Sequence, residues 1–374
     1  MTLDDDSRFG RYLNTLVDKL VVAGVLRSTR WRAAFAATPR HIFVPRFFHP
    51  DPMTGELRRT TSQDADWLEV VYSDQPLATQ FNGKPGDTSG IPTSSSTAPS
   101  LMVTMLELLD LHPRDTVLEI GTGTGYNAAL LSAYLGDCNV TTVDVDGALT
   151  GPARERLAEL DLHPTVVTAD GAAGHPGRAP YDRIIATCAV RRIPTAWLEQ
   201  TKAGGKILVT VETSLHGYGL ALLTVDDERR VSGCILPDAA SFMPMRSQAD
   251  PLFRELRAVA LPRKDQLLTT AIRAEDLESN EARFAVGLQL PDVAAFGMQS
   301  TEGRGLYLAH RADGSWAHLQ PDQTVCIGGP TDLWRQLEGA YLAWVEAGHP
   351  APHQLSVSFS LFQQQLVPTV RQTN

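Results

Sequence analysis

Near its middle the chain reads Thr116-Val-Leu-Glu-Ile-Gly-Thr-Gly-Thr-Gly-Tyr-Asn-Ala-Ala-Leu-Leu131. The segment begins with a short apolar run that is typical of a buried parallel strand, continues with a glycine at every second position, and ends in a helical pattern. Glycine lets backbone approach a ligand closely, and a helix N-terminus offers unpaired N–H groups. An ordinary strand-to-helix turn is the simpler alternative, but three glycines with acidic residues nearby favour a nucleotide-type site.

Two of these acidic residues indicate which cofactor is bound. Asp144 follows a second strand-like run and lies about 20 residues past the last glycine, where an acid accepts hydrogen bonds from ribose hydroxyls. Glu119 precedes the first glycine by two residues, and the spacing is Gly-x-Gly-x-Gly, which differs from the dinucleotide fingerprint. Both departures favour S-adenosylmethionine over NAD, because this cofactor has no pyrophosphate and a carboxylate can hold its cationic end.

The composition is that of an ordinary globular protein. The chain has 374 residues, 43% of them apolar and 20% charged, which is enough for an α/β domain and a further part. A net charge of −10 argues against sequence-independent nucleic-acid binding. The first residues lack the features of a signal peptide, and no apolar run is long enough to span a membrane. We therefore expect a cytoplasmic protein with neither nucleic acid nor membrane as a partner.

No metal site is expected from the cysteines and histidines. The cysteines are far apart and follow no metal-ligand spacing, so we interpret them as buried free thiols in a reducing cytosol; they are Cys138, Cys188, Cys234 and Cys326. The ten histidines form no ligand pattern, and the prolines of His349-Pro-Ala-Pro-His353 indicate a surface connection.

Alternating strand-like and helix-like patterns predict the fold class of the middle of the chain. We expect an α/β, Rossmann-like domain with a mostly parallel seven-stranded sheet, helices on both faces, and ligands at the carboxyl ends of the strands. Its helices are expected at about 147–160 and from 193 to a glycine stop at 203–205. A closing antiparallel pair is expected from the runs at 220–225 and 242–245.

The flanking parts have different patterns. Before the domain we expect two helices over about 8–35, a short strand at 70–72, a flexible loop over 81–96 and a helix from Pro99. Ser94 to Thr97 precede that helix and are good cap formers, so capping is an alternative to a binding role. After the domain, strand-like runs at 282–290, 306–310, 316–319 and 355–362 and a helix at about 331–346 indicate an α+β extension. The predicted parts are 1–110, 111–248 and 249–374.

Several separated stretches resemble, in the same order, those of protein-L-isoaspartate O-methyltransferases, over roughly residues 8–246. The glycine motif is shared by all class I methyltransferases, whereas the first and third stretches of the following list are much more specific. The stretches are Thr38-Pro-Arg-His-Ile-Phe-Val-Pro45, Ser73-Asp-Gln-Pro-Leu77, Ser95-Ser-Thr-Ala-Pro99, Leu118-Glu-Ile-Gly-Thr-Gly-Thr-Gly-Tyr126, Asp170-Gly171, Ala179-Pro-Tyr-Asp-Arg-Ile-Ile185, Leu198-Glu-Gln-Thr-Lys-Ala-Gly-Gly205 and Phe242-Met-Pro-Met245.

The resemblance implies methyl transfer from S-adenosylmethionine, with S-adenosylhomocysteine as product, to an isoaspartyl side-chain carboxyl. A carboxylate is already a nucleophile, so alignment and electrostatics are expected to carry catalysis, with hydroxyls at the acceptor. The implied acceptor residues are Thr97, Ser95 and Ser96. The implied cofactor-binding residues are Glu119, Gly121, Thr122, Gly123, Gly125, Asn127, Asp144, Val145, Asp170 and Gly171, and the implied substrate-binding residues are His41, Val44, Pro45 and Met243.

Two departures from the family shape the functional hypothesis. Thr97 replaces the family's serine, and the chain continues for over a hundred residues past the family's usual end. That layout resembles longer actinobacterial homologues of lanthipeptide and ATP-grasp (graspetide) pathways of ribosomally made peptides. These methylate an aspartate of a modified precursor peptide, and attack by the next backbone N–H gives an aspartimide, which persists or opens to isoaspartate.

We therefore favour a peptide aspartyl O-methyltransferase acting on a macrocyclised precursor peptide, with residues 249–374 recognising the peptide. The first alternative is a repair enzyme for isoaspartyl proteins that carries an extra C-terminal part. The second is a non-catalytic peptide-binding protein that has kept the fold, against which the intact glycine motif and acidic residues argue.

Overall fold

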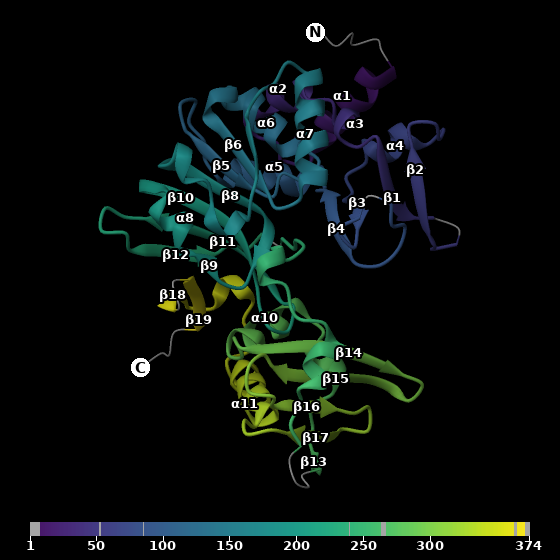
Figure 1. The fold of residues 1–374 in the computed structure, drawn as a ribbon, viewed down its shortest axis with the longest axis vertical. Helices are drawn as coiled ribbons and strands as arrows, with labels where there is room; N and C mark the ends of the chain where they lie inside the picture. The colour runs from purple at the N-terminus through teal and green to yellow at the C-terminus, as the bar shows by residue number, and fades with distance from the viewer. Residues whose placement is uncertain are drawn as a thin grey trace. The chain divides into compact units, whose positions relative to one another are not determined.

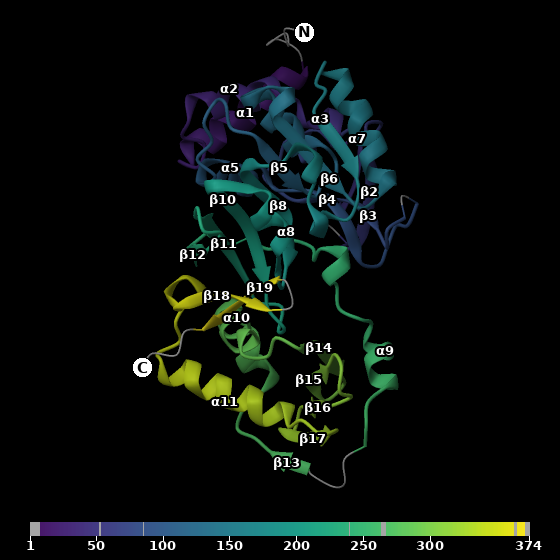
Figure 2. The ribbon, with the colours of Figure 1, turned by 60° about the vertical axis from the view of Figure 1, so that its left-hand side comes forward.

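A computed structural model describes residues 8–51, 54–84, 86–238, 240–262, 267–362 and 365–370. The chain forms two compact units (Figures 1 and 2). The first comprises Met1–Cys188, Ala196–Leu208 and Thr224–Arg230, and the second comprises Ala189–Thr195, Val209–Leu223 and Val231–Asn374. The predicted parts 1–110 and 111–248 fall mostly in the first unit and 249–374 in the second, but the units interleave along the chain.

The central sheet confirms the predicted fold class. It has seven strands in the order β12-β11-β10-β8-β5-β6-β7, and β5 pairs in parallel with both β6 and β8. Every residue of β5 is buried, as expected for a strand in the middle of a covered sheet. The strands are β5 (Val117–Ile120), β6 (Val140–Asp144), β7 (Thr165–Thr168), β8 (Tyr181–Val190), β10 (Thr201–Glu212), β11 (Tyr218–Val225) and β12 (Val231–Ile235).

The helices of the first unit follow the predicted pattern over most of their length. Ser28 caps α2 by accepting a hydrogen bond from the Trp31 amide, and Trp31 stacks on Tyr134 of α6. The helix α6 is buried on nearly all sides, which explains why its sequence shows no polar face. These helices are α1 (Arg8–Val22), α2 (Thr29–Ala37), α3 (Arg40–Phe43), α4 (Trp67–Val71), α5 (Pro99–Leu108), α6 (Tyr126–Leu135), α7 (Gly147–Glu159) and α8 (Thr195–Glu199).

An antiparallel sheet in the order β2-β1-β3-β4 precedes the central sheet in sequence. Its strands are β1 (Arg46–Pro50), β2 (Leu57–Thr61), β3 (Leu77–Phe81) and β4 (Pro92–Ser96). The prediction of a flexible loop over 81–96 was wrong for its last five residues, which gain ladder hydrogen bonds from β3 that local sequence does not reveal. The predicted strand at 70–72 was also wrong, because Trp67, Leu68 and Val71 form the buried face of α4.

The second unit contains a five-stranded sheet in the order β13-β17-β16-β15-β14 and a three-stranded sheet in the order β18-β19-β9. A core that includes Leu308, Trp334 and Leu337 joins the larger sheet to α11. The strands are β9 (Ile193–Pro194), β13 (Leu267–Thr269), β14 (Val293–Ser300), β15 (Gly303–His310), β16 (Trp316–Leu319), β17 (Thr324–Gly328), β18 (Val357–Phe362) and β19 (Gln365–Val370). The helices are α9 (Phe253–Ala258), α10 (Asn280–Leu288) and α11 (Leu333–Glu346).

Three further expectations for secondary structure were wrong. The run at 282–290 is mostly the helix α10, which Ser279 caps and which is buried on several sides, so that its apolar pattern imitates a strand. The glycines at 203–205 lie inside β10, where Gly205 is close to the Asp182 carbonyl. The run at 242–245 makes only an isolated bridge from Pro244 to Ala189.

Short 3₁₀ helices connect several of these elements. They are η1 (Asp137–Asn139), η2 (Gly171–Ala173), η3 (Pro176–Arg178), η4 (Arg246–Gln248), η5 (Ala274–Leu277) and η6 (Pro352–Gln354). None of the helices in the described ranges is both long and apolar enough to cross a membrane.

The four cysteines are free, but burial was predicted wrongly for two of them. Cys138 and Cys234 are exposed, and Cys188 and Cys326 are partly buried. Cys138 lies in η1 and Cys234 in β12, and neither position is covered by another element.

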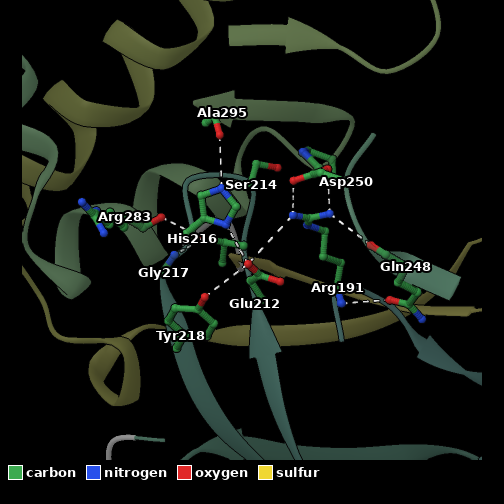
Figure 3. A network of polar contacts seen from close by, with 12 residues as sticks. Arg191, Glu212, Ser214, His216, Gly217, Tyr218, Gln248, Asp250, Arg283 and Ala295 are labelled. Atoms are coloured by element: carbon green, nitrogen blue, oxygen red, sulfur yellow. Dashed lines mark hydrogen bonds and ion pairs between the residues drawn. The ribbon is translucent and has the colours of Figure 1, made fainter. Parts of the chain in front are cut away.

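A buried polar network organises the second unit at the end of β10 (Figure 3). The Oε1 atom of Glu212 accepts hydrogen bonds from His216 Nδ1 at 2.7 Å and from the Tyr218 hydroxyl at 3.3 Å. The other ring nitrogen of His216 lies 3.1 Å from the carbonyl oxygen of Ala295. Because both ring nitrogens face acceptors, the protonated imidazolium is the form that satisfies both contacts, and the hydrogen bond with Glu212 raises the pKa of His216.

Arg191 connects this network to the start of the extension. Its Nη1 donates to Asp250 Oδ1 at 2.8 Å, and its Nη2 contacts both Asp250 and Glu212. Arg311, which directly follows β15, donates to the same Asp250 at 2.8 Å. Segments 189–195, 209–223 and 231–362 therefore share buried charges within one unit.

Candidate cofactor and acceptor site

The glycine turn after β5 has the backbone that its sequence predicts. Gly121 has φ +102° and Gly125 has φ +88°, conformations that residues with a Cβ rarely adopt. A Cβ on Gly121 would lie 2.6 Å from Thr187 Oγ1, and one on Gly125 would lie 3.1 Å from the Cβ of Ala153 on α7. The motif therefore allows the turn, and it also allows α6 to begin close against α7.

Glu119 is fully buried beneath this turn. Its Oε1 accepts from Asn127 Nδ2 at 2.7 Å, and its Oε2 accepts from Thr142 Oγ1 at 2.6 Å. Burial raises the pKa of Glu119 to about 7, although these two hydrogen bonds oppose the shift. Thr142 also bonds Thr122, so the carboxyl helps to fix the turn. Its predicted contact with the cofactor stays a prediction.

Asp144 ends β6 beside the same turn. Its Oδ2 accepts from the Gly123 amide at 2.9 Å, and its Oδ1 accepts from the Asp146 amide at 3.1 Å. These two bonds orient the carboxylate beside the turn. The next residue, Val145, is 46% exposed, which is unusual for valine and gives the site an apolar surface next to the acid.

Asp170 and Gly171 follow β7 at the neighbouring strand end. Asp170 is exposed and caps η2 through Ala172, while the Gly171 carbonyl accepts a hydrogen bond from Trp197 Nε1 at 2.8 Å. The sequence did not single out Cys188, at the end of β8, where burial and the charges of Asp144 and Asp170 raise its pKa to about 12. The sequence alone does not show that Cys188 lies near Asp144 and Asp170, because their proximity depends on the order of the strands in the sheet.

The predicted acceptor residues lie on β4 and just after it. Ser96 is buried and accepts from Arg40 Nε at 3.3 Å, whereas Ser95 and Thr97 are partly exposed. Within the part of the chain that the structure describes, the Ser95 and Thr97 hydroxyls have no protein partner. The capping alternative is wrong, because the N-cap of α5 is Ala98, and the first-turn amide of Ser100 donates to Asp74 Oδ1 at 2.8 Å.

The acceptor segment lies against the glycine turn. A Cβ placed on Gly123 would lie 3.7 Å from the Ser95 carbonyl oxygen and 3.8 Å from Ser94 Oγ. The structure therefore places the segment that carries the predicted acceptor residues against the predicted cofactor turn, although some 25 residues of helix and strand separate the two in sequence.

Arg40 is the functional residue that the sequence analysis missed, although it stands inside a quoted motif. It is fully buried, and its guanidinium donates to the carbonyl oxygens of Ser96 at 3.3 Å and Thr97 at 3.0 Å. It also donates to the carbonyls of Val71 at 2.8 Å and Gln75 at 3.0 Å. Burial lowers its pKa to about 10, so the group stays charged and fixes the acceptor segment.

The predicted substrate-binding residues are dispersed. His41 bonds the Tyr72 hydroxyl at 2.7 Å and stacks on Phe9, and burial lowers the pKa of His41 to about 4. Val44 is fully buried, so its side chain offers no surface to a substrate. Pro45 is exposed. Met243 belongs to the second unit, where its carbonyl accepts from the Ala189 amide at 2.9 Å. These four roles stay predictions.

The residues present fit S-adenosylmethionine. Its ribose hydroxyls and its ammonium and sulfonium cations need acceptors, and the strand ends supply the carboxyls of Asp144 and Asp170, whereas both oxygens of the buried Glu119 already accept protein hydrogen bonds. The Oδ1 atom of Asn127 is a further buried acceptor for which the described structure offers no hydrogen-bond partner. No group of three or more His, Cys, Asp or Glu side chains in the described ranges is placed to hold a metal ion.

Comparisons with known proteins place the chain among one family. A family model described as protein-L-isoaspartate(D-aspartate) O-methyltransferase matches residues 11–233. A protein-L-isoaspartate O-methyltransferase of Methanopyrus kandleri is 34% identical over 238 residues, which are 62% of this chain and 92% of that protein. A solved structure named protein-L-isoaspartate O-methyltransferase has a TM-score of 0.55 at 21% identity, and the likeness covers 96% of this chain and 99% of that chain. A Plasmodium falciparum structure, described as a family member in complex with S-adenosyl-L-homocysteine, covers 63% of this chain and 98% of its own at a TM-score of 0.48 and 14% identity.

Proposed function

The chain belongs to the protein-L-isoaspartate O-methyltransferase family and uses S-adenosylmethionine as methyl donor, and on that premise we propose that Ser95 and Thr97 hold the acceptor carboxylate of an isoaspartyl residue. The observation that carries this proposal is the position of their hydroxyls. Both are partly exposed and have no partner in the described protein, on a segment that contacts the glycine turn.

The reaction needs alignment more than acid–base catalysis. Bound at this site, the cofactor would supply a methyl group on a sulfonium, which an ionised carboxylate can accept without a general base. The products would be a methyl ester and S-adenosylhomocysteine, so the positive charge on sulfur and the negative charge on the carboxylate would both be lost. The role of the protein is to hold the carboxylate oxygen, the methyl carbon and the sulfur in line and to exclude water.

Arg40 would make this alignment rigid. Its guanidinium bonds the carbonyls of Ser96 and Thr97 in the acceptor segment and also the carbonyls of Val71, Ser73 and Gln75, so the acceptor segment is held against residues 71–75. The full burial of Arg40 keeps its charge from contacting the substrate carboxylate directly.

The substrate we propose is an isoaspartyl residue in a polypeptide. A modified precursor peptide is the second candidate, and the observations that favour it are the C-terminal part and the threonine in place of serine. The C-terminal part alone does not distinguish the two, because a solved structure named protein-L-isoaspartate O-methyltransferase matches nearly the whole chain. We further propose that residues 249–374 recognise the substrate polypeptide.

One experiment separates the candidates. The enzyme is incubated with labelled S-adenosylmethionine and three peptides: a linear isoaspartyl peptide, its aspartyl isomer, and a macrocyclic peptide with ordinary aspartate. We expect methyl ester on the isoaspartyl peptide only. Ester on the macrocyclic aspartyl peptide alone would favour the precursor, and no ester on any peptide would contradict both.

A further inference from the structure

A cavity of about 410 Å³ lies in the first unit, apart from the cofactor and acceptor roles described above. Its lining comes from β1, β2 and β3 on one side and from α7 on the other, with Thr124 of the glycine turn between them. Figures 1 and 2 show that the sheet of β1–β4 and α7 lie near each other in this unit, and α3 packs against α7. The cavity thus borders on the site, and of the residues already assigned to the site only Pro45 belongs to its lining.

Three arginines line this cavity, and no aspartate or glutamate does. The pairing of β1 with β2 sets Arg46 opposite Thr61 and Phe48 opposite Arg59, so Arg46 and Arg59 share one face of the sheet. Arg156 comes from α7, one turn after Pro152, and its Nη1 donates to the Thr124 carbonyl at 3.2 Å. We call this cavity, with Arg46, Arg59 and Arg156, the arginine pocket.

The three arginines of the arginine pocket differ from their neighbour Arg58 in their partners. Within the described residues none of the three arginines makes an ion pair, whereas Arg58, the neighbour of Arg59 on the opposite face, pairs with Asp66 at 2.7 Å. Burial lowers the pKa of Arg156, and the charge of Arg46 lowers it further, although Glu155 and Glu159 on the same helix oppose this. A chain with a net charge of −10 has therefore gathered three cations around one cavity.

The shape of the guanidinium group indicates the class of ligand. Arginine presents a planar fork of donors that matches a carboxylate with two parallel hydrogen bonds. Leu149 and Pro152 give an apolar wall, and the hydroxyls of Thr61 and Thr79 line the cavity as acceptors, because they already donate to Asp64 Oδ2 and Ser94 Oγ. Together these groups suit a carboxylate on a short aliphatic stem, which is an aspartate or glutamate side chain.

The arginine pocket is next to the acceptor segment. Its strand β3 pairs with β4, where Ala78 lies opposite Ser95, and Thr79 Oγ1 donates to Ser94 Oγ at 3.0 Å. Paired strands lie about 4.8 Å apart, and an extended peptide advances about 3.3 Å per residue. A substrate whose reacting carboxyl lies at Ser95 and Thr97 therefore reaches the pocket with a residue only a few positions away.

We propose that the arginine pocket binds an aspartate or glutamate side chain of the substrate polypeptide, close in sequence to the residue that is methylated. This inference rests on the proposed function, because the peptide enters the pocket while its isoaspartyl carboxyl is at the acceptor hydroxyls. The enzyme is then selective for isoaspartyl residues in acidic sequences.

Kinetics with two matched isoaspartyl peptides test this. One peptide has glutamate at the positions flanking the isoaspartyl residue, and the other has glutamine there. We expect KM for the glutamate peptide to be about tenfold lower, as one charge-assisted hydrogen-bonded pair would give, and to rise with ionic strength. Arg46→Gln and Arg156→Gln should each remove most of that preference and leave KM for the glutamine peptide unchanged.

Arg58→Gln is the matched control, because it removes a neighbouring arginine that faces the other way and should keep the preference. Binding of S-adenosylhomocysteine by calorimetry shows whether a variant has disturbed the glycine turn, which matters for Arg156 because it bonds Thr124. Equal KM for the two peptides with the unmodified enzyme, or equal losses for both peptides in the variants, would overturn the proposal. If neither peptide is methylated at all, the proposed function itself has failed.

Discussion

Arg40 Nη2 donates to the carbonyl oxygen of Thr97 at 3.0 Å, across 57 residues of chain. This bond joins Arg40, the first residue of α3, to Thr97, the residue that we propose to contact the acceptor carboxylate. It makes the position of a surface hydroxyl depend on a cation with no exposed surface.

Replacing Arg40 with methionine should therefore destabilise the protein and reduce activity together. Several buried carbonyls would lose their donor, and each unsatisfied group costs on the order of 1–3 kcal/mol, so we expect a loss of at least about 3 kcal/mol in the free energy of unfolding. Urea denaturation measures this. Arg32→Met, at an exposed arginine, is the control and should change stability by less than about 0.5 kcal/mol.

Thr97→Val should lower kcat far more than it lowers cofactor affinity. The substitution keeps the shape of the side chain and removes only the hydroxyl, whose loss at a reacting oxygen costs about 100-fold in rate. Steady-state kinetics with an isoaspartyl peptide and calorimetry with S-adenosylhomocysteine give the two quantities. Thr97→Ser keeps the donor and should retain most of the activity, and equal losses of rate and cofactor affinity in Thr97→Val would refute the assignment.

Asp144→Ala should weaken cofactor binding by about 1–3 kcal/mol, because the ribose hydroxyls lose their acceptor. Asp144→Asn should have a smaller effect, since its amide oxygen can still accept from the Gly123 amide. Calorimetric titration of both variants with S-adenosylhomocysteine is the measurement. Asp161→Ala, at a fully exposed acid, serves as control, and an unchanged affinity in Asp144→Ala would exclude a ribose contact.

Glu119→Gln should change how stability depends on pH in the cofactor-free protein. Burial raises the pKa of Glu119 from 4.5 to about 7, so between these values the unfolded chain releases the proton first and stability falls as pH rises. From pH 5 to pH 8 this amounts to about 2–3 kcal/mol in the free energy of unfolding. The glutamine variant lacks this loss, and chemical denaturation at both pH values should show the difference. Parallel pH profiles for the two proteins would contradict it.

His216→Asn should remove a pH dependence from the second unit. Glu212 raises the pKa of His216, so the stabilising contribution is complete below the unfolded value of 6.5 and is lost as pH rises through the folded pKa. Asparagine tolerates the left-handed backbone at this position, φ +57°. Hydrogen exchange of the amides of β14 should accelerate with pH, beyond the intrinsic rate, in the unmodified protein and not in the variant.

The central sheet was predictable because its strands and helices alternate in patterns that burial on both faces requires. The position of Glu119, Gly121 and Asp144 at one edge of this sheet was predictable for a related reason, since the carboxyl ends of parallel strands meet there, and their contacts with the cofactor stay predictions. The strand at 92–96 was not, because serine and threonine pair there with a partner that only tertiary structure supplies.

Arg40 and the arginine pocket were hidden for a different reason. A buried arginine and a surface arginine look alike in sequence, and the role of each depends on which carbonyls or cations come to lie around it. Similarly, the alternation at 282–290 could not reveal that α10 would be covered on several sides. Sequence patterns predict well which face of a helix or strand is buried. They predict poorly which distant segments of the chain come into contact.

The interleaving of the two units has a consequence for dissecting this enzyme. Segments 189–195 and 209–223 lie within the predicted part 111–248, yet Arg191 bonds Asp250, Thr213 bonds the Arg283 carbonyl at 2.9 Å and Ser214 bonds Leu290. A truncation after residue 248 would strand these groups without their partners, among them the buried charges of Arg191 and Glu212. The extension is therefore an inseparable part of the folding of the methyltransferase half, and no single cut along the chain yields two intact modules.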